Sequence, residues 1–139
     1  GLAAWAHNHL SVVALAQGLP DQACAECDQA MDLIAGTPEP IIRTMCANAF
    51  AQGGQRDRAL AQLDTLETYA RENYLDPYCF GYVYAGLGDV DAAAENFTRA
   101  YEEKSSQIWA LGIELIPEEV LADPRIRDLV ARLDYPQNR

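Results

Sequence analysis

The cysteines of this sequence are the side chains best suited to metal binding or redox chemistry. Cys24 and Cys27 form a Cys-x-x-Cys pair, which could supply half of a zinc site or a redox-active dithiol. A zinc site needs a second pair of ligands, whereas Cys46 and Cys79 stand alone in other parts of the chain. A thioredoxin-like dithiol needs a βαβ setting, which the sequence lacks. We therefore interpret the cysteines as small buried hydrophobic residues of a reducing compartment, and metal or redox chemistry stays a remote alternative.

The histidines and acidic pairs give no stronger sign of catalysis. His7 and His9 are two residues apart, which in a helix directs them to different faces, unlike the i, i+4 pair that binds metals. Carboxylate pairs such as Glu102-Glu103 could act as acid and base, but no glycine-rich phosphate loop or Gly-x-Ser-x-Gly elbow accompanies them. The sequence predicts a protein that is not an enzyme and uses no metal or other cofactor.

The balance of charge disfavours two classes of partner. Ten basic residues against 21 acidic ones give a formal net charge of −11, and the first basic residue is Arg43. Nucleic acids and anionic membrane surfaces are bound through clustered Lys and Arg. We therefore expect no direct binding to nucleic acid and none to membranes, and no apolar run reaches the ~18 residues that span a bilayer.

Length and composition favour a helical fold with a sizeable core. The chain has 139 residues, half of them hydrophobic and many of them alanine, while β-branched residues are sparse. It begins without a methionine and inside a helical pattern, so we expect it to be a piece of a longer protein. Reduced cysteines favour a cytoplasmic location for that protein.

A fixed repeat is the strongest signal in the sequence. A shift of 34 residues places Ala47 on Gly81, Gly54 on Gly88 and Leu63 on Phe97, and a shift of 36 residues brings the first stretch into the same register. Small residues within each unit let two helices approach closely, while large ones fill the space between them. The pattern predicts six helices in three pairs, which are 2–17 with 20–35, 39–53 with 56–72, and 76–87 with 90–104. A tail follows them, with further helix expected near 106–112 and 124–133.

In this register the sequence resembles the tetratricopeptide repeat family. The third unit matches the family pattern nearly throughout, whereas the first two match in spacing but substitute several positions; the matching residues are Phe80, Gly81, Tyr84, Gly88, Ala93, Phe97 and Ala100. The resemblance implies an all-α fold, namely a right-handed α-solenoid of three helix pairs. The three pairs would cover about 2–37, 38–72 and 73–104, which together make up residues 1–104. A C-terminal capping tail at 105–139 would belong to the same domain.

The last third of the chain is similar to the C-terminal repeat regions of bacterial signalling proteins. Its Asp76-Pro77-Tyr78 and Ala122-Asp123-Pro124-Arg125 segments carry this likeness. In such proteins the repeats accompany a winged-helix, nucleotide cyclase or protein kinase domain. The resemblance implies a regulatory or scaffold appendage that binds a protein or peptide.

The first helix of each tetratricopeptide pair lines a concave groove, which gives a candidate partner-binding site. The positions that the resemblance assigns to it are mostly apolar, with a few neutral hydrogen-bonding groups. They are Trp5, Asn8, His9, Val12, Leu15, Ile41, Thr44, Met45, Asn48, Gln52, Leu75, Tyr78, Cys79 and Tyr82, with Trp109 closing one end. Such a lining suits a peptide with apolar anchors. A chaperone-type carboxylate clamp is disfavoured, because no Lys or Arg occupies these positions.

Two further expectations concern the ends of the array. The tail should cover the third unit, through Trp109, Leu111, Ile113, Leu115, Ile116, Val120 and Leu121 and then through Ile126, Leu129, Val130 and Leu133. The helix at 2–17 lacks a capping signal and presents Leu2, Trp5 and Leu10, a surface that could meet upstream repeats or form a homodimer. The alternative function is therefore a structural end cap of a longer array, with no separate ligand.

Overall fold

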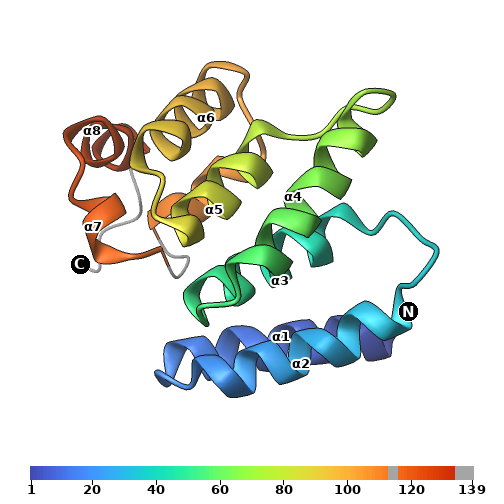
Figure 1. Ribbon diagram of the computed structural model, residues 1–139. Helices are drawn as coiled ribbons and strands as arrows, with labels where there is room; N and C mark the ends of the chain where they lie inside the picture. The colour runs from blue at the N-terminus through green and yellow to red at the C-terminus, as the bar shows by residue number, and fades with distance from the viewer. Residues whose placement is uncertain (113–115, 134–139) are drawn as a thin grey trace.

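The chain is all-helical in the part that its computed structural model describes, residues 1–112 and 116–133. Within these residues there are eight α-helices and one 3-10 helix (η1), and no strand (Figure 1). The elements are α1 (Leu2–Ala16), α2 (Pro20–Leu33), α3 (Pro40–Gln52), α4 (Arg56–Ala70), α5 (Pro77–Leu87), α6 (Val90–Glu102), η1 (Ile108–Gly112), α7 (Glu118–Leu121) and α8 (Pro124–Arg132).

Local sequence signals set where these helices begin and end. Proline occupies the first helical position of α2, α3, α5 and α8, where its missing N–H costs nothing. Asp76 and Asp123 cap α5 and α8, because each accepts a hydrogen bond of 2.9 Å from a backbone N–H in the first turn of the helix that follows. The first helix of each pair is followed by a glycine with a left-handed backbone, at Gly18, Gly54 and Gly88.

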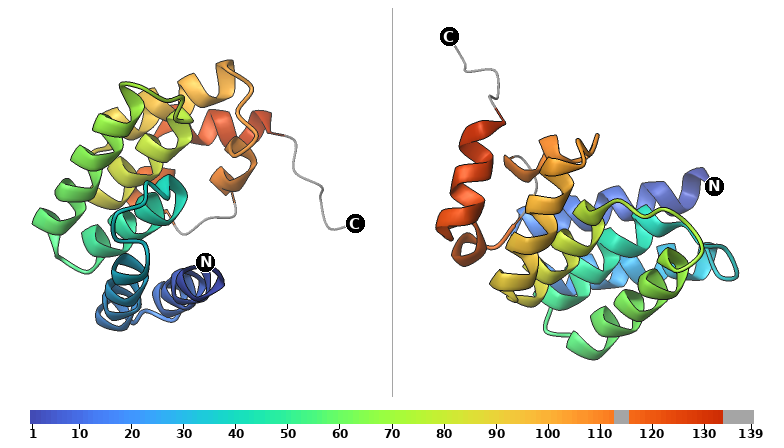
Figure 2. Two further views of the ribbon diagram at one scale, coloured as in Figure 1. Left: turned by 90° about the vertical axis from the view of Figure 1, so that its right-hand side faces the viewer. Right: turned by 90° about the horizontal axis from the view of Figure 1, so that it is seen from above.

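The helices pack in sequential pairs, α1 with α2, α3 with α4, and α5 with α6. The first helices of successive pairs also touch, because α3 contacts both α1 and α5 (Figures 1 and 2). The second helix of one pair contacts the first helix of the next, as α2 does with α3 and α4 with α5. The three first helices therefore form a continuous layer.

The buried hydrophobic residues form two large clusters joined by a small one. One large cluster lies among α1, α2 and α3 and includes Cys27, Ile42 and Phe50. The other large cluster joins α5 and α6 to the tail. Between them lies a small cluster of Ala47, Leu63, Leu66 and Val83, so the smallest group of buried hydrophobic residues is in the middle of the molecule.

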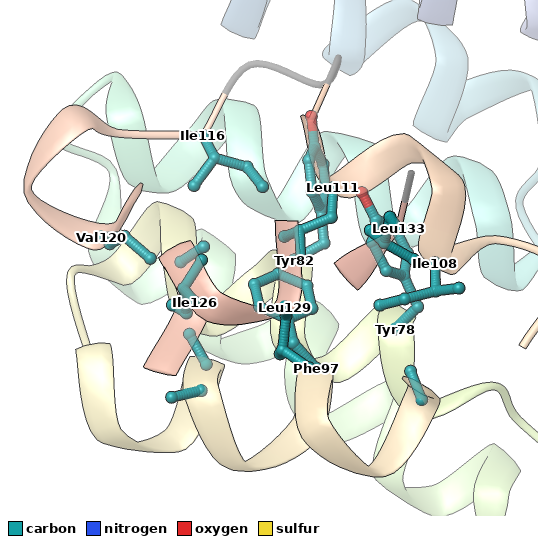
Figure 3. Packing of buried hydrophobic residues seen from close by; sticks show 14 residues of the cluster. Tyr78, Tyr82, Phe97, Ile108, Leu111, Ile116, Val120, Ile126, Leu129 and Leu133 are labelled. Atoms are coloured by element: carbon teal, nitrogen blue, oxygen red, sulfur yellow. The ribbon is translucent and has the colours of Figure 1, made fainter. Parts of the chain in front are cut away.

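The tail packs against the third pair, as predicted. Ile126 and Leu129 on α8, Val120 on α7 and Leu111 on η1 are buried in the cluster that contains Phe97 (Figure 3). The segment near 106–112 is a 3-10 helix, and α7 was not predicted. The expected tail contacts of Ile113 and Leu115 lie outside the described residues. Trp109 was expected to cover the third unit, but half of its surface is exposed.

Candidate functional site

Five of the residues predicted to line the groove are apolar side chains on two contacting helices, α1 and α3, and they keep partial access to solvent. Trp5, Val12 and Leu15 on α1 and Ile41 and Met45 on α3 are neither fully buried nor fully exposed. We call these five residues the α1–α3 face. The two helices meet where the Asn8 amide donates a hydrogen bond of 3.2 Å to the Met45 sulfur. Next to the face, the exposed His9 places its ring 6.1 Å from the Trp5 ring, centre to centre.

The two asparagines predicted to reach a partner are instead buried. Asn48 donates a hydrogen bond of 2.8 Å to the Tyr82 carbonyl on α5 and accepts one of 2.6 Å from Gln52. Gly86 makes this arrangement possible, because a side chain there would meet Asn48 at 2.8 to 3.0 Å. Asn8 is also fully buried, so the prediction that Asn8 and Asn48 line an open groove was wrong. Asn48 ties α3 to α5, and Gln52 supports it from a partly exposed position.

Thr44 and Cys79 also belong to the packing between α3 and α5 rather than to an open surface. Both are buried, and the Thr44 hydroxyl donates to the Pro40 carbonyl at 2.7 Å. Burial raises the pKa of the Cys79 thiol to about 11, while a hydrogen bond with Thr44 opposes that rise. Their placement in the groove by family resemblance was therefore wrong, because the third pair lies too close to the second to leave them open.

The tail covers the third section of the predicted groove. Tyr78 and Tyr82 are almost fully buried, and the same hydrophobic cluster contains Ile108, Leu111 and Leu129 of the tail (Figure 3). The Tyr78 ring lies 5.3 Å from that of Phe97, centre to centre. The prediction that Tyr78 and Tyr82 face a partner was wrong for this reason, and only Leu75, partly exposed before α5, keeps access to solvent there.

The cysteines and His7 are placed as structural residues. Cys24, Cys27 and Cys46 are free thiols buried among α1, α2 and α3, and the Cys27 sulfur is 3.2 Å from the Ser11 hydroxyl. Burial raises the pKa of Cys24. His7 on α1 contacts Glu26 on α2, with 2.6 Å between Nδ1 and Oε2. Across residues 1–112 and 116–133, no group of three or more His, Cys, Asp or Glu side chains could hold a metal ion.

A cavity that the sequence did not indicate lies at the tail end of the molecule. Its volume is about 520 Å³, and it is lined by aromatic, aliphatic and basic side chains that include Tyr101, Lys104, Ile108, Trp109, Arg132 and Leu133. Trp109 is the one predicted site residue among them. The lining residues come from two segments, 101–109 and 132–133, that are far apart in the sequence. No repeated spacing links these segments, so sequence periodicity could not predict the cavity.

Comparison with protein-family models, with curated proteins and with solved structures gives no match. None of the described helices combines the length and the apolar character that crossing a bilayer requires.

Proposed function

We propose that this chain is a non-catalytic protein-interaction module of tetratricopeptide type, a right-handed α-solenoid of three helix pairs closed by the tail. It binds an apolar peptide or protein segment along the α1–α3 face. The parent protein is a cytoplasmic bacterial regulator, as the likeness of the last third of the sequence to signalling proteins suggests. The packing of first helices on one another, α1 on α3 and α3 on α5, supports the solenoid assignment.

The observation that carries the proposal is the α1–α3 face itself. Five apolar side chains from two successive first helices remain partly open to solvent. By contrast Tyr82 and Ala85, the α5 positions equivalent to Val12 and Leu15, are buried in the cluster that includes the tail. Apolar side chains that gather on one surface mark binding sites more often than scattered ones do. The face carries aromatic, branched and thioether groups, which suit pockets for apolar anchors of a partner.

A structural end cap is a second candidate, and the tail favours it. Burial of Ile126 and Leu129 against the third pair closes that end of the array with polar helices outermost, as capping elements of solenoids do. In this function the chain would end a longer array, and the α1–α3 face would have no separate ligand.

Site-specific photo-crosslinking separates the two functions. A photoreactive amino acid replaces Val12 on the α1–α3 face, and a matched control places it at Leu60, an exposed apolar residue on α4. A partner captured in the source cell's lysate from position 12 and not from 60 is then identified and produced in pure form. We expect Trp5→Ala to weaken its binding in calorimetry by tenfold or more, the range of a central aromatic anchor. Equal capture at both positions, or binding that Trp5→Ala leaves unchanged, would reject the proposed face.

A further inference from the structure

The side of α1 that faces away from the fold carries a row of apolar residues. Leu2 is 90% exposed, Val13 is 50% exposed, and Ala6 and His9 lie exposed between them. Leu10, 51% exposed, lies beside this row. The opposite side of α1 packs into the molecule through Ala4, Asn8, Ser11 and Ala14. We call Leu2, Ala6, His9 and Val13 the outer row. The helix that carries it, α1, lies at the edge of the fold (Figure 2, left).

The spacing of the outer row is the same in both directions along the helix. Its members are separated by four, three and four residues, so they form one narrow line on the helix surface. When a second copy of the helix is turned end for end about a two-fold axis, the row falls on itself. Leu2 of one copy then lies opposite Val13 of the other, and Ala6 lies opposite His9. The small Ala6 leaves room for the imidazole ring, so the row is complementary to itself, as an isologous contact requires.

The distribution of charge also favours the association of two copies of the chain at this surface. The chain has a net charge of −11, so two copies repel each other at most approaches. The outer faces of α2, α4 and α6 carry exposed acids, such as Asp21 and Asp32 on α2 and Asp91 and Glu95 on α6. No Asp, Glu, Lys or Arg occurs in residues 1–20. Two copies can therefore bury apolar surface at α1 without bringing acidic groups together.

We propose that two copies of this chain associate through antiparallel α1 helices along the outer row. The contact does not rest on the peptide-binding proposal, because the outer row shares no residue with the α1–α3 face, although His9 lies beside Trp5. A helix of 15 residues is about 22 Å long, which limits the buried area, so the association depends on protein concentration.

Sedimentation equilibrium of the whole chain tests the association. The weight-average mass should rise from 15.3 kDa toward twice that value as the protein concentration increases. Val13→Glu places a charge in the contact and should weaken the association at least tenfold. Leu60→Glu, at an exposed apolar residue of α4, is the matched control and should leave it unchanged. A chain that stays monomeric at all concentrations, or a Val13→Glu variant that associates like the original, overturns the proposal.

A charge-exchange experiment tests the register. Leu2→Lys and Val13→Glu should each prevent self-association, since either places two unpaired charges in the homodimer. A mixture of the two variants should recover dimers, because Lys at position 2 of one copy lies opposite Glu at position 13 of the other. Circular dichroism checks that both remain helical, as expected for positions at least half exposed. Recovery supports the antiparallel pairing, and a mixture without dimers overturns it.

Discussion

The ring of Phe97 lies directly against the backbone of Gly81, so α6 packs closer to α5 than a side chain at position 81 would allow. A Cβ atom at position 81 would lie 2.6 Å from two carbons of that ring, and Phe97 is itself fully buried. We expect Gly81→Ala to reduce the free energy of unfolding in urea by about 1–3 kcal/mol, because neither group can move away without disturbing the packing.

Glu103→Ala is the control for that experiment. Glu103 is exposed and forms a 3.7 Å ion pair with Arg99 at the surface of α6. Loss of this ion pair should change the free energy of unfolding by no more than about 0.5 kcal/mol. Equal effects of the two substitutions would contradict the close approach of α5 and α6.

Gly86→Ala should also destabilise the protein, although alanine is normally the better helix residue by about 1 kcal/mol. Its Cβ would lie 2.8 Å from the amide nitrogen and 3.0 Å from the Cα of Asn48. Because the backbone of α3 limits any adjustment, we expect a loss of about 1–3 kcal/mol in urea unfolding. In an Asn48→Ala background the same change should cost less, since the amide contact is gone. A stabilising Gly86→Ala would show that α3 and α5 lie further apart than described.

The tail should unfold together with the third pair. Ile126 on α8 is fully buried in the cluster that contains Tyr78, Tyr82 and Phe97. We expect Ile126→Ala to cost about 2–5 kcal/mol and to speed hydrogen exchange in α5 and α6. Leu60→Ala, at an exposed position on α4, should do neither. Normal protection of α5 and α6 in the Ile126→Ala variant would show that the tail does not contribute to their stability.

The four cysteines should react slowly with thiol reagents in the folded protein. All are buried, and the pKa of Cys79 is raised to about 11, so at pH 8 its reactive thiolate is scarce. We expect the rate of alkylation of Cys79 by iodoacetamide to rise about tenfold with each pH unit and to level off only near pH 11, and all four thiols to react at once in denaturant. Rapid labelling of any cysteine at pH 8 in the native state would contradict its burial.

The paired helices were predictable because their signals are local. Proline at first helical positions and glycine after α1, α3 and α5 placed most helix ends within two residues of those observed. The faces of Gly81 and Phe97 followed from helical spacing alone. Only the short α7 was missed, and its four residues are too few to show a helical period.

The candidate site was predicted less well because exposure depends on contacts between distant segments. Periodicity placed Asn48 and Tyr82 on the first helices, but it could not indicate that the Asn48 amide bonds to the Tyr82 carbonyl. Nor could it indicate that η1 and α8 fold over Tyr78 and Tyr82. The positions that stayed open, such as Trp5 and Val12, lie farthest from the tail along the array.

The division of the buried residues into two large clusters with a small one between them has a consequence for cooperativity. The α1–α3 cluster and the cluster of α5, α6 and the tail have no buried residue in common. They are connected by the small cluster of Ala47, Leu63, Leu66 and Val83 and by the partly buried Met45 and Leu87. In linear arrays, stability is a sum of unit and neighbour contributions rather than a single all-or-none quantity. The two ends of this molecule can therefore melt as separate units, so denaturation followed by Trp5 and denaturation followed by Trp109 need not share one midpoint.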